Sequence, residues 1–290
     1  MPDWLAAEYP FTPRRWVTAR GAAMSYLDVG PVEPHAVVMV HGNPTWSYYY
    51  RWVVRALGPR IRCVVPDHVG MGLSDKPEGY PYTLESRIDD LESLVLGLGL
   101  ETVDLLVHDW GGAIGFGFAA RHPARVRRIG ILNTAAFALD RIPARIALCR
   151  FPGLGPLMVR GLNGFARPAT RMAMHRRSLT GDQKRAYLLP YDSWANRVAV
   201  NAFVQDIPMN PRHPTWAVLK AIEAAVPQFG DRPVRIVWGG EDFCFNDLFL
   251  ARWRELLPRA DVTRIADAGH YVIEDARAEA VPLLADFFRR

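Results

Sequence analysis

The stretch 102–120 constrains the fold most, because an apolar run meets a segment of small residues across a short polar turn. The run TVDLLV (102–107) predicts a buried strand, and AIGFGFAA (113–120) predicts a helix packed tightly against a sheet. HDWGG lies between them and places Asp109 at a sharp strand-to-helix turn. An aspartate at such a turn is either a helix N-cap or a reactive carboxylate, and the rest of the chain must decide between the two.

Other segments predict the sheet around this strand. Residues 14–29 alternate like an antiparallel hairpin at a sheet edge, and residues 84–98 have helical periodicity. Strands alternating with helices favour a mostly parallel sheet with helices on both faces, in which ligands bind beyond the carboxyl ends of the strands. The remaining strands are predicted at 36–40, 61–65, 126–132, 234–238 and 262–265, before a C-terminal amphipathic helix.

The strand pattern stops between residues 135 and 214, where arginine, proline, methionine and aromatic residues are frequent. With 290 residues, half of them hydrophobic, the chain can bury one large core. We therefore predict a core formed by 1–134 and 215–290, and an inserted helical cap at 135–214. An apolar stripe in the cap fits either a hydrophobic substrate or an ordinary helical core, and it comprises Phe151, Leu154, Leu157, Met158, Phe165, Met172 and Met174.

Composition disfavours several classes of protein. No apolar run is long enough to span a bilayer, and the N-terminus lacks the pattern of a signal peptide, so we expect a cytoplasmic protein. Cys63, Cys149 and Cys244 are widely spaced and odd in number, which suggests neither disulfides nor a metal site. We expect no cofactor and no metal.

The formal net charge is +5, and arginine is spread through the chain. The densest cluster has the spacing of a solvated helix face, which we favour over a nucleic-acid site. A basic cap face near a membrane or an acidic partner remains the alternative. The cluster consists of Arg167, Arg171, Arg176 and Arg177.

Asp109, Asp242 and His270 each follow a predicted strand, in the order nucleophile, acid, histidine. The α/β-hydrolase fold uses this order, and its nucleophile elbow usually carries serine. Taken singly, Asp242 fits a turn and His270 fits a hydrogen-bonded loop. Their joint position at three strand ends favours a catalytic set. Further histidines in these loops are interpreted as hydrogen-bonding scaffold: His41, His68, His108 and His122.

A carboxylate nucleophile restricts the chemistry. Asp109 would displace a leaving group from saturated carbon and form an alkyl ester, which suits halides, epoxides and strained lactones. His270, oriented by Asp242, would activate water against that ester, and the backbone N–H groups of Trp110 and Asn43 would hold the developing charge. The indole of Trp110 and the amide of Asn43 are neutral donors suited to an anionic leaving group. Alternatively, Trp110 packs on the cap and Asn43 shapes its turn.

Four segments resemble the haloalkane dehalogenases: HGNPTWSYYYR (41–51), PDHVGMGLSDKP (66–77), HDWGGAIGF (108–116) and DAGHYVIED (267–275). The resemblance implies the α/β-hydrolase fold with its cap. By position it implies that Asp109 is the nucleophile and His270 the base, and that Asn43 and Trp110 stabilise the halide.

The resemblance also bears on the acid. Some dehalogenases carry it after the strand that here ends at Leu132, but this sequence has Asn133 and Thr134 there. The acid is therefore expected at Asp242, with Asp247 as the second choice.

A narrower resemblance changes the expected substrate. NTAAF (133–137), PYDSWANRVAV (190–200) and FVQDIP (203–208), with PDHVGMGLSDKP, are similar to the β-lactone decarboxylases of bacterial long-chain olefin biosynthesis. These relatives of the dehalogenases keep the same catalytic set and convert a cis-3-alkyl-4-alkyloxetan-2-one to a cis-alkene and CO₂. Because the match includes cap segments, which select substrate, we favour it over the dehalogenases. It also implies association with other olefin-pathway enzymes, and a homo-oligomer stays open.

Two rival functions remain. Epoxide hydrolases use the same set of residues, with cap tyrosines as acids, and Tyr187 and Tyr191 are available here. However, they typically carry an aromatic residue where this chain has Asn43. A non-catalytic binding protein of the same fold is the other rival, although it need not retain both Asp109 and His270.

Overall fold

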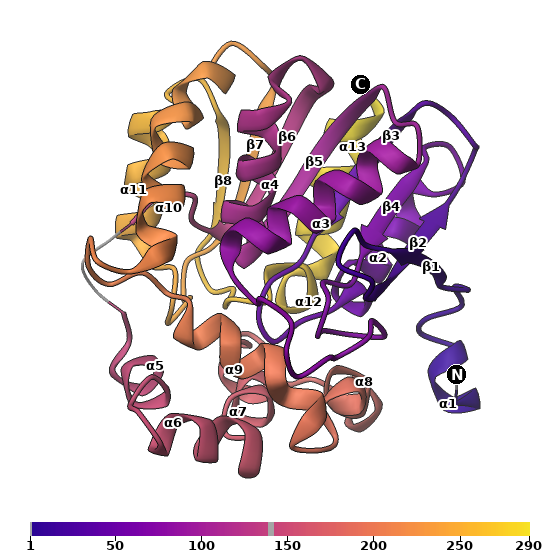
Figure 1. The fold of residues 1–290 in the computed structure, drawn as a ribbon. Helices are drawn as coiled ribbons and strands as arrows, with labels where there is room; N and C mark the ends of the chain where they lie inside the picture. Colours follow the sequence, from indigo (N-terminus) through magenta and orange to yellow (C-terminus); the bar gives the residue numbers. More distant parts are fainter. Residues whose placement is uncertain (1, 139–141) are drawn as a thin grey trace.

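The computed structural model describes residues 2–138 and 142–290, and it shows an eight-stranded sheet flanked by helices (Figure 1). Across the sheet the strands lie in the order β1-β2-β4-β3-β5-β6-β7-β8. β2 is antiparallel to β1 and β4, and all other pairs are parallel. The strands are β1 (Arg14–Val17), β2 (Ala23–Val29), β3 (His35–Val40), β4 (Cys63–Pro66), β5 (Thr102–Asp109), β6 (Val126–Thr134), β7 (Val234–Gly239) and β8 (Asp261–Ile265).

These strands confirm the predicted mostly parallel sheet. The hairpin predicted at 14–29 is β1 and β2 at one edge of the sheet. β4 begins at Cys63 rather than at residue 61, and β5 continues past the apolar run to include Asp109. Asp109 is therefore the last residue of the strand, and the backbone pairing of β5 fixes its position relative to the sheet.

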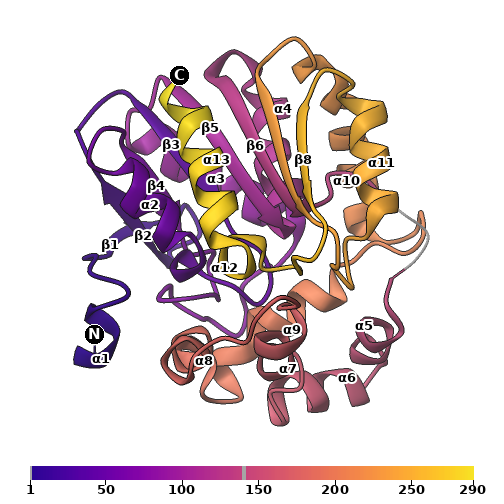
Figure 2. The ribbon, with the colours of Figure 1, turned by 180° about the vertical axis from the view of Figure 1, so that it is seen from behind.

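Helices cover both faces of the sheet, and each face has its own buried core (Figures 1 and 2). Successive strand residues point to opposite faces, so Val38 and Val40 of β3 join one core while Val37 and Met39 join the other. The first core packs against α3 (Leu84–Gly97), α4 (Trp110–Arg121), α10 (Pro214–Ala225) and α11 (Asp247–Leu256); the second packs against α2 (Arg51–Leu57), α12 (Val272–Asp275) and α13 (Arg277–Arg289).

Between β6 and β7, residues 135–138 and 142–213 contain short helices and no strand. They lie beyond the carboxyl ends of the strands (Figure 1). α10 packs on α3 and α4, which supports our proposal that the core resumes near residue 215. The cap elements are α5 (Ala144–Cys149), α6 (Leu154–Pro156), η3 (Leu157–Gly161), α7 (Ala166–Met172), α8 (Gly181–Leu188), η4 (Leu189–Tyr191), η5 (Ala195–Arg197) and α9 (Val198–Gln205).

The other short helices are α1 (Asp3–Ala6), which contacts α8, then η1 (Ser47–Tyr50), η2 (Pro123–Arg125) and η6 (Val226–Phe229). In the part of the chain that the structure describes, no helix has the length and apolar character needed to cross a bilayer.

Candidate active site

Asp109 occupies the sharp turn between β5 and α4, with φ 53° and ψ −128°. A positive φ is strained for a residue other than glycine, so the surrounding packing must hold it. Gly111 makes that packing possible, because a Cβ there would lie 1.9 Å from the backbone oxygen of Val40 in β3. The Asp109 side chain accepts no hydrogen bond from the second or third residue of α4, as an N-cap side chain would. The helix-cap interpretation is therefore wrong, and the carboxylate points elsewhere.

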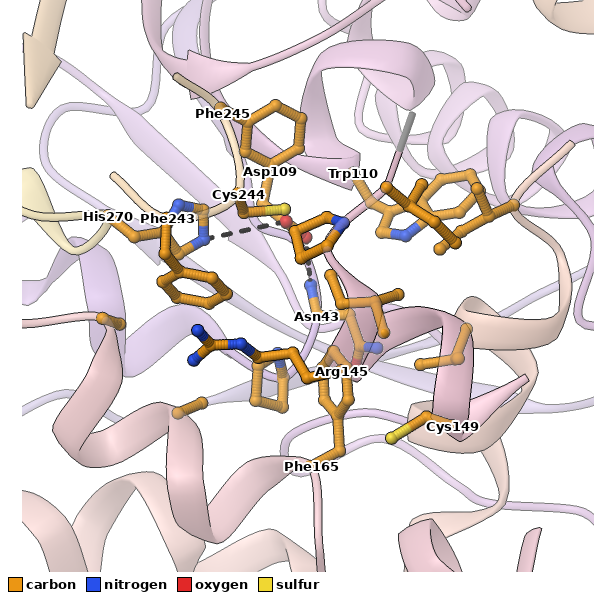
Figure 3. Close-up of a pocket in the computed structure, with 18 of the residues that line it drawn as sticks. Asn43, Asp109, Trp110, Arg145, Cys149, Phe165, Phe243, Cys244, Phe245 and His270 are labelled. Carbon is orange, nitrogen blue, oxygen red and sulfur yellow. Dashed lines mark hydrogen bonds and ion pairs between the residues drawn. The ribbon is translucent and has the colours of Figure 1, made fainter. Parts of the chain in front are cut away.

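The Asp109 carboxylate is buried, and its two oxygens have different neighbours (Figure 3). Oδ1 accepts a hydrogen bond from the backbone N–H of Asn43 at 2.6 Å, and the backbone N–H of Trp110 also bonds to the carboxylate. Oδ2 lies 3.7 Å from Nε2 of His270, beyond hydrogen-bonding distance. Burial raises the pKa of Asp109 above its ordinary value, although His270 and the two N–H groups oppose this. Oδ2 is thus the oxygen with lone pairs free to attack.

His270 is held by Asp242 on its other side. Nδ1 of His270 donates to Oδ2 of Asp242 at 2.7 Å, and Oδ1 of Asp242 accepts from the backbone N–H of Cys244, also at 2.7 Å. Burial alone would lower the pKa of His270, but the carboxylates of Asp242 and Asp109 outweigh it, and the pKa is raised. The structure therefore brings together the three residues that the sequence singled out, with Nε2 directed at Asp109.

The other two positions considered for the catalytic acid lie away from His270. Asp247 forms an ion pair with Arg264 at 2.9 Å, on the surface. Asn133 uses its amide to bind the backbone of Gly239, donating to the oxygen at 2.9 Å and accepting from the N–H at 2.8 Å. Asn133 thus joins β6 to β7, while Asp242 at the end of β7 faces the histidine.

The side chains of Asn43 and Trp110 both line the cavity beside Asp109 (Figure 3). One amide hydrogen of Asn43 goes to the backbone oxygen of Val200 in α9, at 3.1 Å, which leaves the second hydrogen available. The indole of Trp110 packs against Phe203, with ring centroids 5.4 Å apart. Its N–H has no hydrogen-bond partner among residues 2–138 and 142–290. Trp110 packs on the cap, as the alternative interpretation expected, whereas the Asn43 side chain bonds to the cap. In the part of the chain that the structure describes, each side chain also keeps an N–H without a partner.

A cavity of about 490 Å³ lies between the core and the cap, above Asp109 and His270. Its walls are mostly apolar, and the cap contributes from α5, η3 and α7. The predicted cap stripe divides: Met158, Phe165 and Met172 line the cavity, while the other members do not. A hydrophobic ligand with one small polar group fits such a site. The cavity's charged residues are Asp109, Arg145 and His270.

Residues 35–276 match the family model described as alpha/beta hydrolase fold. The chain belongs to this α/β-hydrolase family. It is 46% identical to a cis-3-alkyl-4-alkyloxetan-2-one decarboxylase of Xanthomonas campestris, over 97% of each protein. It is also 46% identical to a decarboxylase of the same name from Shewanella oneidensis, over 94% of this chain and 87% of that protein. A crystal structure of a haloalkane dehalogenase from Bradyrhizobium elkani superimposes with a TM-score of 0.88 at 25% identity, over 96% of this chain and 98% of that one.

Three of the further histidines form hydrogen bonds with the backbone of the segments that carry this α/β-hydrolase site. His41 donates from Nδ1 to the backbone oxygen of Gly42 at 2.8 Å and accepts at Nε2 from the backbone N–H of His68 at 3.1 Å. His108 donates to the backbone oxygen of His270 at 3.0 Å. Burial lowers the pKa of all three, to about 4 for His41 and well below the ordinary value for His68 and His108.

The prediction that His122 lies in the loops at the carboxyl ends of the strands is wrong. Helix α4 carries it to the amino-terminal edge of the parallel strands, where it pairs with Glu92. The error arose because a helix after an elbow reverses the direction of the chain, so its last residue lies far from its first.

Sequence reasoning missed the aromatic wall that follows Asp242. Phe243, Phe245 and Phe249 line the cavity, and Phe245 stacks on the His270 ring with centroids 5.7 Å apart. The available signal was the run DFCFNDLF after the predicted strand 234–238, with apolar residues beside the acid. The Phe245 ring covers one face of the histidine.

The cap tyrosines lie outside the cavity. Tyr187 donates to Oε1 of Glu274 at 2.8 Å, and Tyr191 donates to the backbone oxygen of Thr45 at 3.2 Å. Neither hydroxyl can protonate an epoxide oxygen at Asp109, which argues against an epoxide hydrolase. No cluster of three or more potential metal-binding side chains occurs within residues 2–138 and 142–290.

Proposed function

We propose that this protein converts cis-3-alkyl-4-alkyl-β-lactones to cis-alkenes and CO₂. The observation that carries the proposal is the 46% identity, over nearly the whole chain, to two proteins named for this reaction. The apolar cavity above Asp109, with neutral donors from Asn43 and Trp110, supports it because the substrate is apolar and the expelled group is an anion.

In the proposed first step, Oδ2 of Asp109 attacks the ring carbon that carries the lactone oxygen. A carbon–oxygen bond forms with inversion, the ring carbon–oxygen bond breaks, and the ring oxygen becomes part of a tethered carboxylate. The side-chain donors of Asn43 and Trp110 receive this carboxylate as they would receive a halide. Oδ1 stays bound to the backbone N–H of Asn43, which orients the carboxylate for attack.

In the second step, the carbon–carbon bond to the carboxylate breaks and CO₂ leaves. Its electron pair forms the alkene while the ester oxygen returns to Asp109 as a carboxylate, so no water is consumed. Inversion followed by anti elimination converts a cis ring to a cis alkene. His270, with its raised pKa, lies 3.7 Å from Oδ2 and stabilises the returning negative charge when protonated.

Haloalkane dehalogenation is the second candidate. It uses the same nucleophile and donors, and one feature favours it: the pair His270–Asp242, at 2.7 Å, is the arrangement needed to activate water against an ester. The structural similarity to a haloalkane dehalogenase supports the same candidate.

A side-by-side assay tests the two candidates. The purified protein receives a cis-dialkyl β-lactone or a 1-bromoalkane, and alkene and halide are measured. We expect cis-alkene from the lactone, no turnover by Asp109→Ala, and full turnover by the surface variant Asp247→Asn. Halide release without alkene formation contradicts the proposal, as does a trans alkene. Incorporation of ¹⁸O from water into Asp109 during lactone turnover contradicts the water-free route. Ligand binding that survives in Asp109→Ala, with no wild-type turnover, indicates a binding protein.

We also propose that the protein acts in the cytoplasm beside the enzymes that make its lactone, as the family resemblance implies. Co-purification with those enzymes, and the size of the free protein on gel filtration, test the complex and the homo-oligomer.

A further inference from the structure

The outer side of the cap carries a row of exposed apolar side chains. Leu148, Phe151, Leu154 and Leu157, here called the outer patch, are 46%, 62%, 43% and 55% exposed. They recur at every third position, and backbone hydrogen bonds from Phe151 to Leu148 and from Gly155 to Phe151 keep the turns together. Helix α6 lies on the side of the cap farthest from the sheet, and α5 lies next to it at one end of the cap (Figures 1 and 2). Such a continuous apolar surface usually marks an interaction site.

The outer patch is continuous with the cavity. Leu148 is exposed and also lines the cavity, and Met158, directly after Leu157, lines it from the same side. Arg145 lines the cavity one turn before Leu148 and is itself exposed. The outer patch therefore adjoins the cavity at Leu148.

The surrounding segment is strongly basic. Residues 135–177 contain eight arginines and a single acidic residue, Asp140. Arg150, Arg160, Arg176 and Arg177 are engaged by the protein's own backbone oxygens or carboxylates. Three others are exposed and have no carboxylate partner among residues 2–138 and 142–290: Arg145, Arg167 and Arg171.

We propose that the outer patch and these three arginines bind the surface of an anionic lipid bilayer. Exposed leucine and phenylalanine side chains enter the boundary between headgroups and acyl chains, while arginines attract anionic headgroups. A bilayer accounts for both features at once, whereas an acidic protein partner would account only for the arginines. Because the outer patch adjoins the cavity, binding would face the cavity toward the lipid, where an apolar lactone collects; this last step rests on the proposed function.

Sedimentation with vesicles tests the proposal without substrate. We expect the protein to bind vesicles of phosphatidylcholine with phosphatidylglycerol at least about tenfold better than phosphatidylcholine alone. Salt at about 0.5 M should weaken binding, because it screens the arginines. Phe151→Ser with Leu157→Ser should lower binding about tenfold, and Arg167→Gln with Arg171→Gln should do the same. Val32→Ser and Arg259→Gln, exposed residues of the same types beside the amino ends of β3 and β8, should bind like the wild type.

Equal binding to both kinds of vesicle, no binding to either, or unchanged binding by both double variants would overturn the proposal. Binding to polyglutamate but not to anionic vesicles would instead identify an acidic protein surface as the partner. Asp109→Ala should bind vesicles like the wild type, so a failure of the proposed function and a failure of membrane binding give separate results.

Discussion

At the scale of single residues, the site combines a buried carboxylate with donors that carry no charge. Burial raises the pKa of Asp109, and the N–H groups of Asn43 and Trp110 keep the ionised form accessible by binding it. A cationic donor in place of the two neutral side chains would pair with Asp109 and reduce its ability to attack. Neutral donors instead gain strength only as the leaving group acquires charge.

This argument predicts the effect of Trp110→Phe. The phenyl ring keeps the packing against Phe203 but removes the N–H, which has no partner within the described residues. We expect kcat to fall by about 10²–10³-fold with the fold intact, as for the loss of one donor to a developing anion. Steady-state kinetics and circular dichroism check this, and Trp194→Phe, on the cap surface, is the control. Unchanged kcat would show that Trp110 only packs.

The positions of the reactive residues were predictable from the sequence, and their neighbours were not. Asp109 ends a strand and Asp242 and His270 each follow one, and the carboxyl ends of parallel strands share one edge of the sheet. The aromatic wall depends on how the loop after Asp242 turns, and the bond from Asn43 to Val200 depends on where α9 docks. Neither follows from periodicity.

At the scale of elements, the elbow requires close contact between α4 and the sheet. Gly111→Ala should destabilise the protein by about 1–3 kcal/mol or more, because the new Cβ would collide with the rigid backbone oxygen of Val40. Urea denaturation measures the loss. Gly79→Ala is the matched control, since a Cβ there meets nothing within 4 Å. A loss of similar size at both positions would contradict the argument.

A buried ion pair connects α3 to the cap. Arg87 donates to Asp206, just after α9, at 3.3 Å, and its guanidinium lies 3.6 Å from the Phe203 ring centroid. Burial lowers the pKa of Arg87 to about 10 and raises that of Asp206. Since Phe203 contacts Trp110, the pair also positions the helix that faces the nucleophile.

Arg87→Met should therefore cost about 3–5 kcal/mol, because it leaves the Asp206 carboxylate buried without its cation. Adding Asp206→Asn should recover part of this loss, since the unpaired charge is then gone. Equilibrium unfolding in urea compares the variants, with Arg259→Met in the exposed pair with Asp231 as the control. A double variant no more stable than Arg87→Met would show that geometry, and not charge, is responsible.

The same comparison shows which elements could be predicted. The strands could be predicted because their side chains are buried on both faces of the sheet by the two cores, which gives them continuous apolar runs. The cap helices were predicted only as a region: α6 spans three residues, too short for a periodic signal. Which cap residues face the cavity and which form the outer patch depends on how these short pieces pack.

At the scale of the whole molecule, pH acts through groups buried in the core. Burial lowers the pKa of His41 to about 4, whereas an unfolded histidine has a pKa near 6.5. As the pH falls from 6.5 to 4, His41 binds a proton in the unfolded chain but not in the native state, so native stability is lost. Asp67 and Asp90, whose pKa values burial raises to about 6, act in the opposite direction between pH 6 and 4.

Replacing His41 isolates its share of this dependence. His41→Gln keeps an acceptor for the His68 N–H but does not titrate, while Asp67 and Asp90 stay unchanged. Between pH 6.5 and 4 the wild type should lose up to about 1.4 kcal/mol per pH unit more than the variant, or about 3 kcal/mol in all. Urea denaturation at a series of pH values measures the difference. Above pH 7 the two curves should run parallel, and parallel curves below pH 6 as well would show that native His41 takes up the proton.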